Sequence, residues 1–400
     1  MQYRIDKRTG NELSVLGFGC MRFPKTVGII DYKKTEEMIV HSINKGVNYF
    51  DTAWIYPGSE ETLGSILEKN RLRDKVYIAT KLPLVMVKKP QDFDKYFEQS
   101  LLRLKTNYID YYLLHMITDF DLFLKLKSMG IEDWIAKKKA GGQIRQIGFS
   151  FHGSGTEFLK IIDDYDWEFC MIQYNYSDEN FQAGVTGLRA AAAKMPVMIM
   201  EPLFGGRLAT GLPKDAVKIF KQADPKLSPA GWALNWIWNQ NEATSLLSGM
   251  STMAQLEENL NLADAAQAGM CNGENEKKTY ADVLKILNRS NKINCTGCNY
   301  CMPCPAGVNI PGCFSSFNSM YSLGYAAGMR QFITSIGLIS EKGGAPSQCI
   351  KCGKCEPHCP QNIPIMKELA TVKKRMEPLP IRLIGILARA FMGRQRKKRR

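Results

Sequence analysis

Cysteines with short, regular spacing are the residues of this 400-residue chain that point most directly to chemistry. Eight of the twelve cysteines lie in two runs: Cys295, Cys298, Cys301 and Cys304, then Cys349, Cys352, Cys355 and Cys359. A proline, Pro305 or Pro360, follows each run. Because a spacing of two residues lets three thiolates of one loop converge on one inorganic core, the runs predict iron-sulfur clusters.

Zinc sites and disulfides are the other structures that such cysteines form. Zinc ligands usually come in separated pairs and disulfides disagree with a cytoplasmic chain, so iron-sulfur chemistry is favoured. The second run resembles the bacterial ferredoxin motif, whereas the first is one residue shorter before its last cysteine. The resemblance implies two [4Fe-4S] clusters with crossed ligand sets, Cys295, Cys298, Cys301 with Cys359 and Cys349, Cys352, Cys355 with Cys304. Two local sets of four cysteines are the alternative.

A second group of reactive side chains, Asp51, Tyr56, Lys81 and His115, stands at or just after the ends of apolar runs in the first third of the chain. A carbonyl that is reduced by hydride needs a proton for its oxygen. A tyrosine beside an ammonium group supplies one readily, because the cation favours the phenolate that remains. Asp51 would hold Lys81 charged, and His115 would orient or polarise the carbonyl.

Eight short runs rich in Val, Ile and Tyr are separated by helical stretches, an alternation that indicates a parallel sheet. Eight such units in about 260 residues favour a closed (β/α)8 TIM barrel. The long interval between the seventh and eighth runs predicts an additional helix there. The predicted strands are Ser14–Cys20, Tyr49–Ala53, Val76–Leu82, Tyr108–Met116, Gln146–His152, Phe169–Tyr176, Val197–Leu203 and Ser245–Met250.

In order and spacing, these four residues resemble the catalytic tetrad of the aldo/keto reductase family. The resemblance covers roughly residues 1–265, and further short motifs support it: Gly17-Phe18-Gly19, Gly148-Phe149-Ser150, Gln173-Tyr174-Asn175, Glu201-Pro202-Leu203, Ser248-Gly249-Met250-Ser251 and Glu257-Glu258-Asn259. It implies an NAD(P)H-dependent reductase of aldehydes or ketones in which Tyr56 donates the proton.

The same resemblance assigns the cofactor contacts. Ser150 and Gln173 would bind the nicotinamide carboxamide, and the pyrophosphate and adenosine end would be lined by Leu203, Gly249, Ser251, Gln255, Glu258 and Asn259. Met200 replaces an aromatic ring that usually stacks on nicotinamide, and Gln255 replaces an arginine that often binds the NADP 2′-phosphate. NADH and NADPH therefore stay equally open, with Arg207 as a candidate compensating cation. No flavin motif is recognisable.

The predicted organisation is a barrel over residues 1–270, a linker helix over 271–290, a small, mainly helical ferredoxin-like iron-sulfur domain over 291–370 and a basic amphipathic tail over 371–400. The formal net charge is +14, and much of it lies in the last seven residues. A terminal basic run is usually a solvated tail, and contact of this tail with an acidic partner or a membrane surface is the alternative. No nucleic-acid-binding motif accompanies the charge, which argues against nucleic acid. The polar start of the chain lacks a signal peptide, which predicts a cytoplasmic protein.

Taken together, the residues predict a carbonyl reductase whose fused clusters serve electron transfer with a redox protein partner or redox sensing. Clusters of this kind also predict oxygen sensitivity and a role in anaerobic metabolism. The alternative is a non-catalytic, cofactor-binding sensor or docking subunit of a redox complex. The residues do not indicate which carbonyl compound is the substrate.

Overall fold

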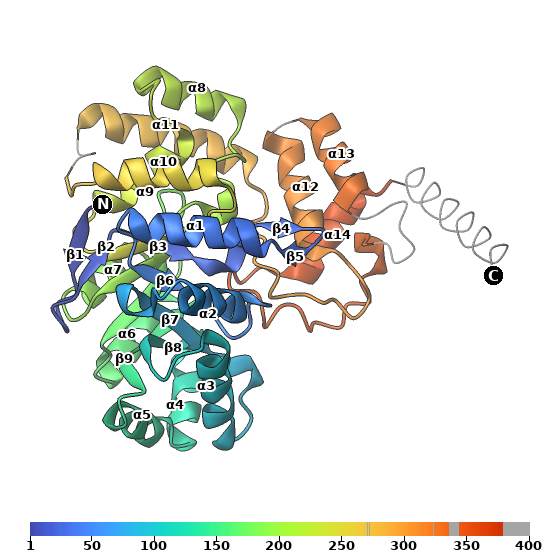
Figure 1. Cartoon of the computed structure of the whole chain (residues 1–400). Coiled ribbons are helices and arrows are strands. Elements are labelled where there is room, and N and C mark those ends of the chain that lie inside the picture. Colours follow the sequence, from blue (N-terminus) through green and yellow to red (C-terminus); the bar gives the residue numbers. More distant parts are fainter. Residues whose placement is uncertain (270, 272, 323, 336–343, 379–400) are drawn as a thin grey trace. The chain divides into compact units, whose positions relative to one another are not determined.

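The computed structural model describes residues 1–269, 271, 273–322, 324–335 and 344–378 (Figure 1). Contacts divide the chain into two units, Met1–Leu203 with Gly231–Asn272 and Phe204–Ala230 with Gly273–Arg400. This division differs from the single boundary predicted near residue 270, because the segment 204–230 belongs with the C-terminal part of the chain. We call the two units the barrel unit and the cysteine unit.

The barrel unit contains a closed barrel of eight parallel strands, as the alternating pattern predicted. The strands follow one another around the barrel in chain order, and the last pairs with the first. They are β3 (Leu16–Gly19), β6 (Tyr49–Asp51), β7 (Tyr77–Leu82), β8 (Ile109–Ile117), β9 (Ile144–Phe151), β10 (Phe169–Gln173), β11 (Val197–Met200) and β12 (Ser245–Ser248).

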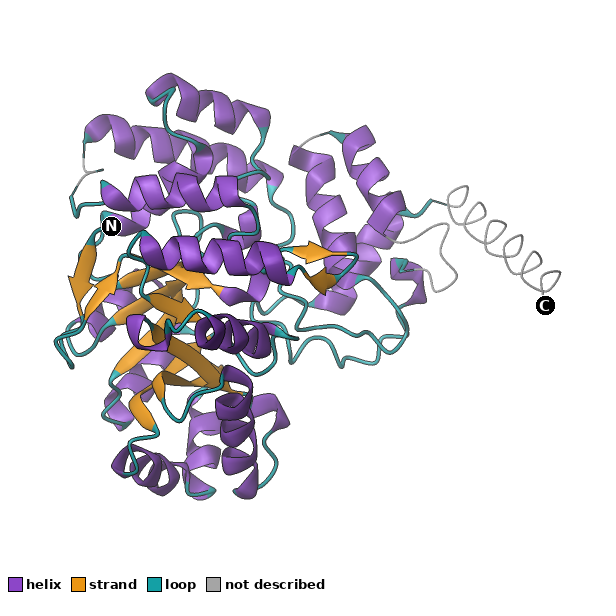
Figure 2. Ribbon diagram, viewed as in Figure 1, coloured by secondary structure: helices purple, strands orange, loops and turns teal. Residues whose placement is uncertain are grey.

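Helices surround these strands (Figure 2). They are α1 (Tyr32–Asn44), α2 (Ser59–Lys69), α3 (Gln91–Leu104), α4 (Phe120–Ser128), α5 (Ile131–Ala140), α6 (Gly155–Asp164), α7 (Gly184–Ala192), α9 (Pro229–Trp238) and α10 (Met253–Asp264). Two hairpins complete the barrel unit, β1 (Tyr3–Ile5) with β2 (Glu12–Ser14) and β4 (Lys25–Thr26) with β5 (Ile29–Ile30). Neither hairpin was predicted from the sequence.

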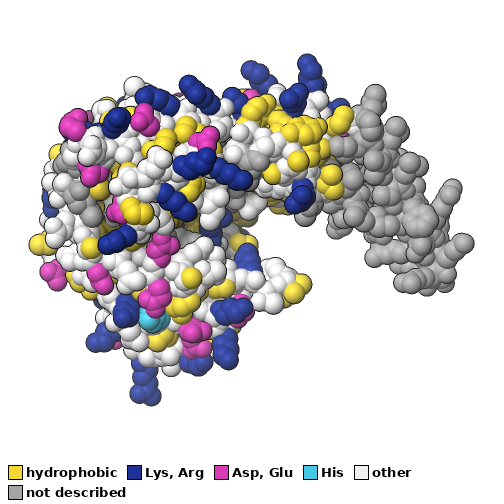
Figure 3. Space-filling view, turned by 90° about the horizontal axis from the view of Figure 1, so that it is seen from above, with side chains coloured by type: hydrophobic (Ala, Val, Ile, Leu, Met, Phe, Trp, Pro, Cys, Tyr) yellow, Lys and Arg dark blue, Asp and Glu magenta, His cyan; other side chains and the backbone are white. Residues whose placement is uncertain are grey.

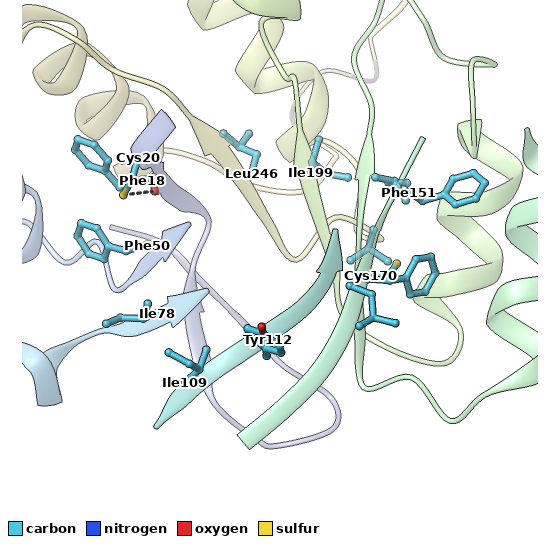
Figure 4. Packing of buried hydrophobic residues seen from close by; sticks show 14 of the residues in the cluster. Phe18, Cys20, Phe50, Ile78, Ile109, Tyr112, Phe151, Cys170, Ile199 and Leu246 are labelled. Carbon is cyan, nitrogen blue, oxygen red and sulfur yellow. Dashed lines mark hydrogen bonds between the residues drawn. The ribbon is translucent and has the colours of Figure 1, made fainter. Parts of the chain in front are cut away.

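Side chains of the barrel strands alternate between two apolar clusters. The outward-facing cluster, which includes Phe18, Phe50, Ile78 and Tyr112, packs beneath the helices (Figure 4). The inward-facing cluster fills the interior with residues such as Tyr49, Ala79, Tyr111, Leu113 and Met171. The barrel is therefore a packed core, and a ligand can be bound only at its ends.

The inward-facing rows change from apolar to polar as each strand reaches its carboxyl end. Two residues beyond Tyr49, Ala79, Leu113 and Met171, the same rows continue with Asp51, Lys81, His115 and Gln173. Since side chains two residues apart on a strand point to the same face, these polar groups gather at one end of the barrel.

The cysteine unit is mainly helical, as predicted, and its described residues form no strand. Its helices are α8 (Lys214–Ala223), α11 (Glu274–Ser290), α12 (Ile310–Ser322), α13 (Tyr325–Ser335) and α14 (Ile365–Met376), with short 3-10 turns at Phe204–Gly206 and Pro346–Gln348. The additional helix predicted before the eighth barrel strand is α8, and Phe220 of α8 packs against Tyr280 of α11. Residues such as Phe314, Phe317, Leu369 and Val372 form the core.

No helix in the described ranges is both long enough and apolar enough to cross a membrane. The predicted amphipathic segment Leu379–Met392 and the terminal basic run lie outside the described residues. On the face seen in Figure 3, lysine and arginine side chains are interspersed with acidic ones and do not form one continuous basic stripe.

Candidate active site and candidate metal centre

Asp51, Tyr56, Lys81 and His115 come from three neighbouring strands, β6, β7 and β8, and from the turn that follows β6. The Lys81 Nζ atom lies 2.7 Å from both carboxylate oxygens of Asp51 and 2.7 Å from the carbonyl oxygen of Thr52. Only 2% of Lys81 is exposed. The ammonium group is thus paired, and its direction is set by three acceptors.

Tyr56 lies beside both Lys81 and His115. The Lys81 Nζ atom is 5.1 Å from the centre of the Tyr56 ring, and the Tyr56 and His115 rings meet edge to face with centres 6.1 Å apart. The backbone N–H of Tyr56 donates to the carbonyl oxygen of Ala53, which closes the turn after β6. The structure therefore brings all four tetrad candidates together.

A bulge in β8 lies next to His115. The pairing of β8 with β9 shifts between Leu114 and Ile117, and Met116 has a φ of 62°, in the left-handed region. The N–H of Met116 donates to the Oγ atom of Ser150 at 2.9 Å. Because this Oγ atom acts as an acceptor, the hydroxyl proton of Ser150 can be donated to a further group.

Burial decides the charge of the histidines in this region. Burial, the Lys81 cation and His152 together hold the pKa of His115 well below its usual range. Burial likewise lowers the pKa of His152 to about 4, although a contact with Gln182 opposes the shift. Both imidazoles are therefore neutral at pH 7. Burial also raises the pKa of Asp51, and the Lys81 ammonium offsets part of that rise.

Four cysteines from both runs line one cavity of the cysteine unit, namely Cys295, Cys298 and Cys301 of the first run and Cys359 of the second. Apolar residues, among them Phe314 and Ile363, complete the lining. Burial, reinforced by the thiols of Cys298, Cys295 and Cys359, raises the pKa of Cys301 to about 12. Burial also raises the pKa of Cys355, and Cys349 and Cys304 are among the groups that add to this rise.

The spacing of these thiols bears on the type of metal. Among the described residues, no three His, Cys, Asp or Glu side chains converge closely enough to hold a single metal ion. Four cysteine thiols around one cavity are a ligand set that suits a [4Fe-4S] core. The grouping in the cavity corresponds to the crossed ligand set.

The two cysteine runs share several features of backbone conformation. In each loop, the residues just before and just after the second cysteine have positive φ angles: Gly297 and Asn299 in the first, Lys351 and Gly353 in the second. The Cys-Pro steps also match, because Gly307 N–H donates to Cys304 O and Asn362 N–H donates to Cys359 O. A helix, α12 or α14, then begins six residues after each of these cysteines. The cysteine unit thus contains an internal repeat that includes both cysteine runs.

In each run, the residue two positions before the first cysteine is held by hydrogen bonds to a side chain from another part of the cysteine unit. Asn318 of α12 accepts from the N–H of Ile293 at 3.0 Å and donates to the carbonyl oxygen of Ile293 at 2.6 Å. In the second loop, Ser347 donates to the carboxylate of Glu377 through its N–H at 3.0 Å and its hydroxyl at 2.6 Å. Both loops are therefore held from a neighbouring helix or its end.

The first loop has a further contact, made by the segment that follows β11. Arg207 Nη1 donates to the carbonyl oxygen of Ile293 at 3.2 Å, and its guanidinium lies 5.0 Å from the Phe204 ring. A Cβ atom at Gly205, whose φ is 66°, would clash with the carbonyl oxygen of Thr296. This close approach requires glycine at position 205.

The aldo/keto reductase family model matches residues 15–269, which is more than half of the chain. The chain belongs to the aldo/keto reductase family. A second model, of the 4Fe-4S dicluster domain, matches residues 294–363 and places such a domain after the barrel.

Individual aldo/keto reductases are similar to this chain at low identity. An aldo-keto reductase of Mycobacterium sp. (strain KMS) is 29% identical over 39% of this chain and 51% of its own length, so the chain spans about half of that relative. A D-galacturonate reductase of Fragaria ananassa is 27% identical over 63% of this chain and 82% of its own length. Among solved structures, the aldo-keto reductase AKR11C1 from Bacillus halodurans is 21% identical, covers 71% of this chain and 96% of its own, and has a TM-score of 0.57, which shows the same fold.

Five of the residues predicted to contact the cofactor lie between the end of β12 and the middle of α10: Gly249, Ser251, Gln255, Glu258 and Asn259. Asn259 Nδ2 donates to Ser248 Oγ at 2.9 Å, and Ser251 N–H donates to Gln255 Oε1 at 2.9 Å. Gln173 lies in the interior row of β10, whereas Leu203 and Glu258 are half-buried. At Gly249, a Cβ atom would lie 3.2 Å from Cδ of Arg22.

Arg22, which lies beside Gly249, is not among the predicted site residues. The feature of the sequence that could have identified Arg22 is its position as a basic residue at the end of the turn Cys20–Arg22, directly after the first barrel strand. Arg207, the cation that the sequence suggested for the 2′-phosphate, instead contacts Ile293 and Phe204 in the cysteine unit.

Proposed function

We propose that this aldo/keto reductase reduces an aldehyde or ketone with NAD(P)H, with Tyr56 as the proton donor. The observation that carries the proposal is the group formed by Lys81, paired to Asp51, and the rings of Tyr56 and His115 beside it. Order and spacing along the chain do not by themselves require these four side chains to lie together. Because they converge at the polar end of a barrel whose interior is packed with side chains, they form one compact proton-donating site.

Each member of the group has a physical role. The Lys81 cation stabilises the phenolate that Tyr56 becomes when it protonates the carbonyl oxygen. Asp51 keeps that cation in place through a bidentate ion pair. His115, neutral at pH 7, can donate an N–H to the carbonyl oxygen without bringing a second positive charge near Lys81.

Bound NAD(P)H supplies the hydride to the carbonyl carbon, while the chain supplies orientation and the proton. Ser150, whose Oγ already accepts from Met116, has its hydroxyl proton available for the nicotinamide carboxamide, and Gln173 would be the second contact. At the other end, Gly249, Ser251, Gln255, Glu258, Asn259 and Leu203 would hold the phosphates and adenosine.

The charge at that end favours Arg22 as the cation that faces the dinucleotide phosphates. Its side chain covers Gly249, where some family members have a lysine. Gln255 is engaged by Ser251 and carries no charge. We infer that the chain accepts both NADH and NADPH, with any preference for NADPH dependent on Arg22.

We further propose that the cysteine unit holds two [4Fe-4S] clusters with crossed ligand sets. The cavity that joins Cys359 to Cys295, Cys298 and Cys301 supports this pairing over local sets of four. The clusters would transfer single electrons or sense the redox state, and a redox protein would be their partner.

Replacement of Tyr56 by phenylalanine tests the catalytic proposal. We expect turnover of a probe such as 4-nitrobenzaldehyde to fall by about 10²–10⁴-fold, because the proton donor is lost. The Kd for NADPH, measured by protein fluorescence, should stay within about twofold. Tyr165→Phe, which removes a hydroxyl outside this site, is the matched control and should keep full turnover.

Unchanged turnover in Tyr56→Phe would contradict the proposal. A wild-type chain that binds NADPH but reduces no carbonyl would instead favour the non-catalytic, cofactor-binding subunit. Iron and sulfide content, with electron paramagnetic resonance after dithionite and after NADPH, tests the clusters separately. Stoichiometric zinc in place of iron would rule them out.

A further inference from the structure

The two cysteine loops differ in how much of each is exposed. We call residues Cys295–Cys301 the first loop and Cys349–Cys355 the second loop. The residue after the first cysteine is Thr296 in the first loop, which is 5% exposed, and Ile350 in the second, which is 68% exposed. The middle cysteines follow the same trend, since Cys298 is half-buried and Cys352 is exposed. A cluster ligated by Cys352 would therefore lie close to solvent.

Positive charge flanks the exposed cysteine. Lys351 and Lys354 lie one residue before and two residues after Cys352, and both are exposed. Glu356 is the only acidic residue between Cys349 and Cys359, and it is half-buried and accepts a hydrogen bond from the N–H of Met366 at 2.9 Å. Ile350 adds exposed apolar area to the same loop. The second loop thus combines a ligand cysteine, two cations and one apolar contact residue.

We propose that the second loop is the docking surface for an acidic one-electron carrier protein. The inference rests on the proposed clusters and assigns the partner's binding site. In the reductive direction the carrier loses one electron and the cluster of the second loop gains it, with no bond or proton exchanged. The segment 204–207 approaches the first loop at Thr296 and contacts Ile293 just before it, so the first loop would hold the inner cluster.

Charge complementarity selects the class of partner. The second loop exposes Lys351 and Lys354, while its acidic neighbour Glu356 is half-buried, so an acidic protein is attracted to this loop and a basic one is repelled. Steering of this kind raises association rates by about 10–10³-fold and is lost as salt increases. Lysines next to the exposed ligand would orient an acidic carrier with its own redox centre toward Cys352, and Ile350 would supply the apolar centre of a small transient interface.

The experiment is stopped-flow reduction of the cluster-loaded, full-length protein by a reduced plant-type [2Fe-2S] ferredoxin, an acidic one-electron carrier. In the double variant Lys351→Glu/Lys354→Glu, the second-order rate constant should fall by about tenfold at low ionic strength. Wild type and variant should converge in about 0.5 M salt, where screening removes the attraction. Ile350→Ser should slow the reaction at both salt concentrations.

The matched control is Lys277→Glu/Lys278→Glu, which reverses two exposed lysines of α11 and should change the rate by less than about twofold. Equal cluster signals after dithionite in all variants establish that the clusters are intact. A rate unaffected by the second-loop reversal, or lowered as much by the control, would overturn the docking proposal. Failure to find any cluster would instead refute the proposed function on which it rests.

Discussion

The first and second cysteine loops have the same backbone winding, yet they have different neighbours. Positive φ angles recur at equivalent positions, and each loop is anchored two residues before its first cysteine. Gly205 approaches the first loop at Thr296, and Arg207 contacts Ile293 just before that loop, both from a segment that lies between two barrel strands in the sequence. The cysteine motif therefore determines the backbone conformation of a loop, whereas segments distant in the sequence determine how exposed that loop is to solvent.

This difference gives the two proposed clusters different tasks. A covered loop protects its cluster from solvent, and an exposed loop allows a partner to approach within electron-transfer distance. Reduction potential also depends on solvent exposure and on nearby charge, so the two clusters should not be equivalent. The following predictions test whether each cluster takes cysteine ligands from both runs. They also test whether the two loops differ in their contact with the segment 204–207, in the hydrogen bonds that anchor them and in their accessibility to oxygen.

The largest effect should come from Cys359→Ser, which tests whether the two loops share ligands. With crossed sets, this change in the second run removes the cluster of the first loop, and iron content should fall from about eight atoms per chain to about four. Electron paramagnetic resonance identifies which signal is lost, with Cys352→Ser as the matched variant for the other cluster. Loss of the same signal in both variants would establish local sets of four.

Gly205→Ala should destabilise the first loop and spare the second. The new Cβ atom clashes with Thr296 O and strains a positive φ angle, for a cost of about 3 kcal/mol in the free energy of unfolding of the cysteine unit. Gly206→Ala is the control, because Gly206 also has a positive φ but has no atom within 4 Å of the new Cβ position. Thermal unfolding of the cluster-loaded protein measures both, and equal losses would indicate that strain alone is responsible.

The hydrogen bonds that anchor the two loops should differ less in their contribution to stability than the contact at Gly205 does. Asn318→Ala removes the bonds to Lys292, Ile293 N–H and Ile293 O, and should cost about 2–3 kcal/mol. Glu377→Ala removes the two bonds to Ser347 and should cost about 1–2 kcal/mol. The rate of iron release to a chelator, followed for each cluster, checks the order. A larger effect of Glu377→Ala would reverse the proposed ranking of the two anchors.

The smallest difference should appear under air. Because Cys352 is exposed and Cys298 is half-buried, the cluster of the second loop should decay a few-fold faster than that of the first. Paramagnetic resonance on samples taken at intervals after exposure to oxygen measures the two decays. Equal decay rates would mean that the exposure of the ligand cysteine does not control oxygen attack.

Much of the barrel could be predicted because its strands carry strong local signals. The eight runs rich in branched and aromatic residues became the eight strands, and the polar residues that follow Tyr49, Ala79 and Leu113 by two positions became the candidate site. The helical character of the cysteine unit also followed from the sequence. In both cases neighbouring residues along the chain contain the information.

Long-range packing could not be predicted from such patterns. The helix α8 has the amphipathic pattern of an ordinary barrel helix, and nothing local indicates that Phe220 packs against Tyr280, sixty residues further along the chain. The place of Arg22 beside Gly249 depends on the pairing of β12 with β3. The hairpin of β4 and β5 was missed because Val27 has a φ of 51°, which β-branched residues rarely adopt.

The segment 204–230 has a practical consequence for dissecting the protein. Truncation after residue 272 would remove α11 and both cysteine runs but leave α8 attached to the barrel, with Phe220 deprived of Tyr280. A soluble reductase fragment would therefore need two edits, a stop codon near residue 272 and a short linker in place of residues 204–230. Conversely, a ferredoxin fragment starting at residue 273 would lack the glycine and arginine that cover its first loop, and should be expressed with the excised segment supplied as a separate peptide.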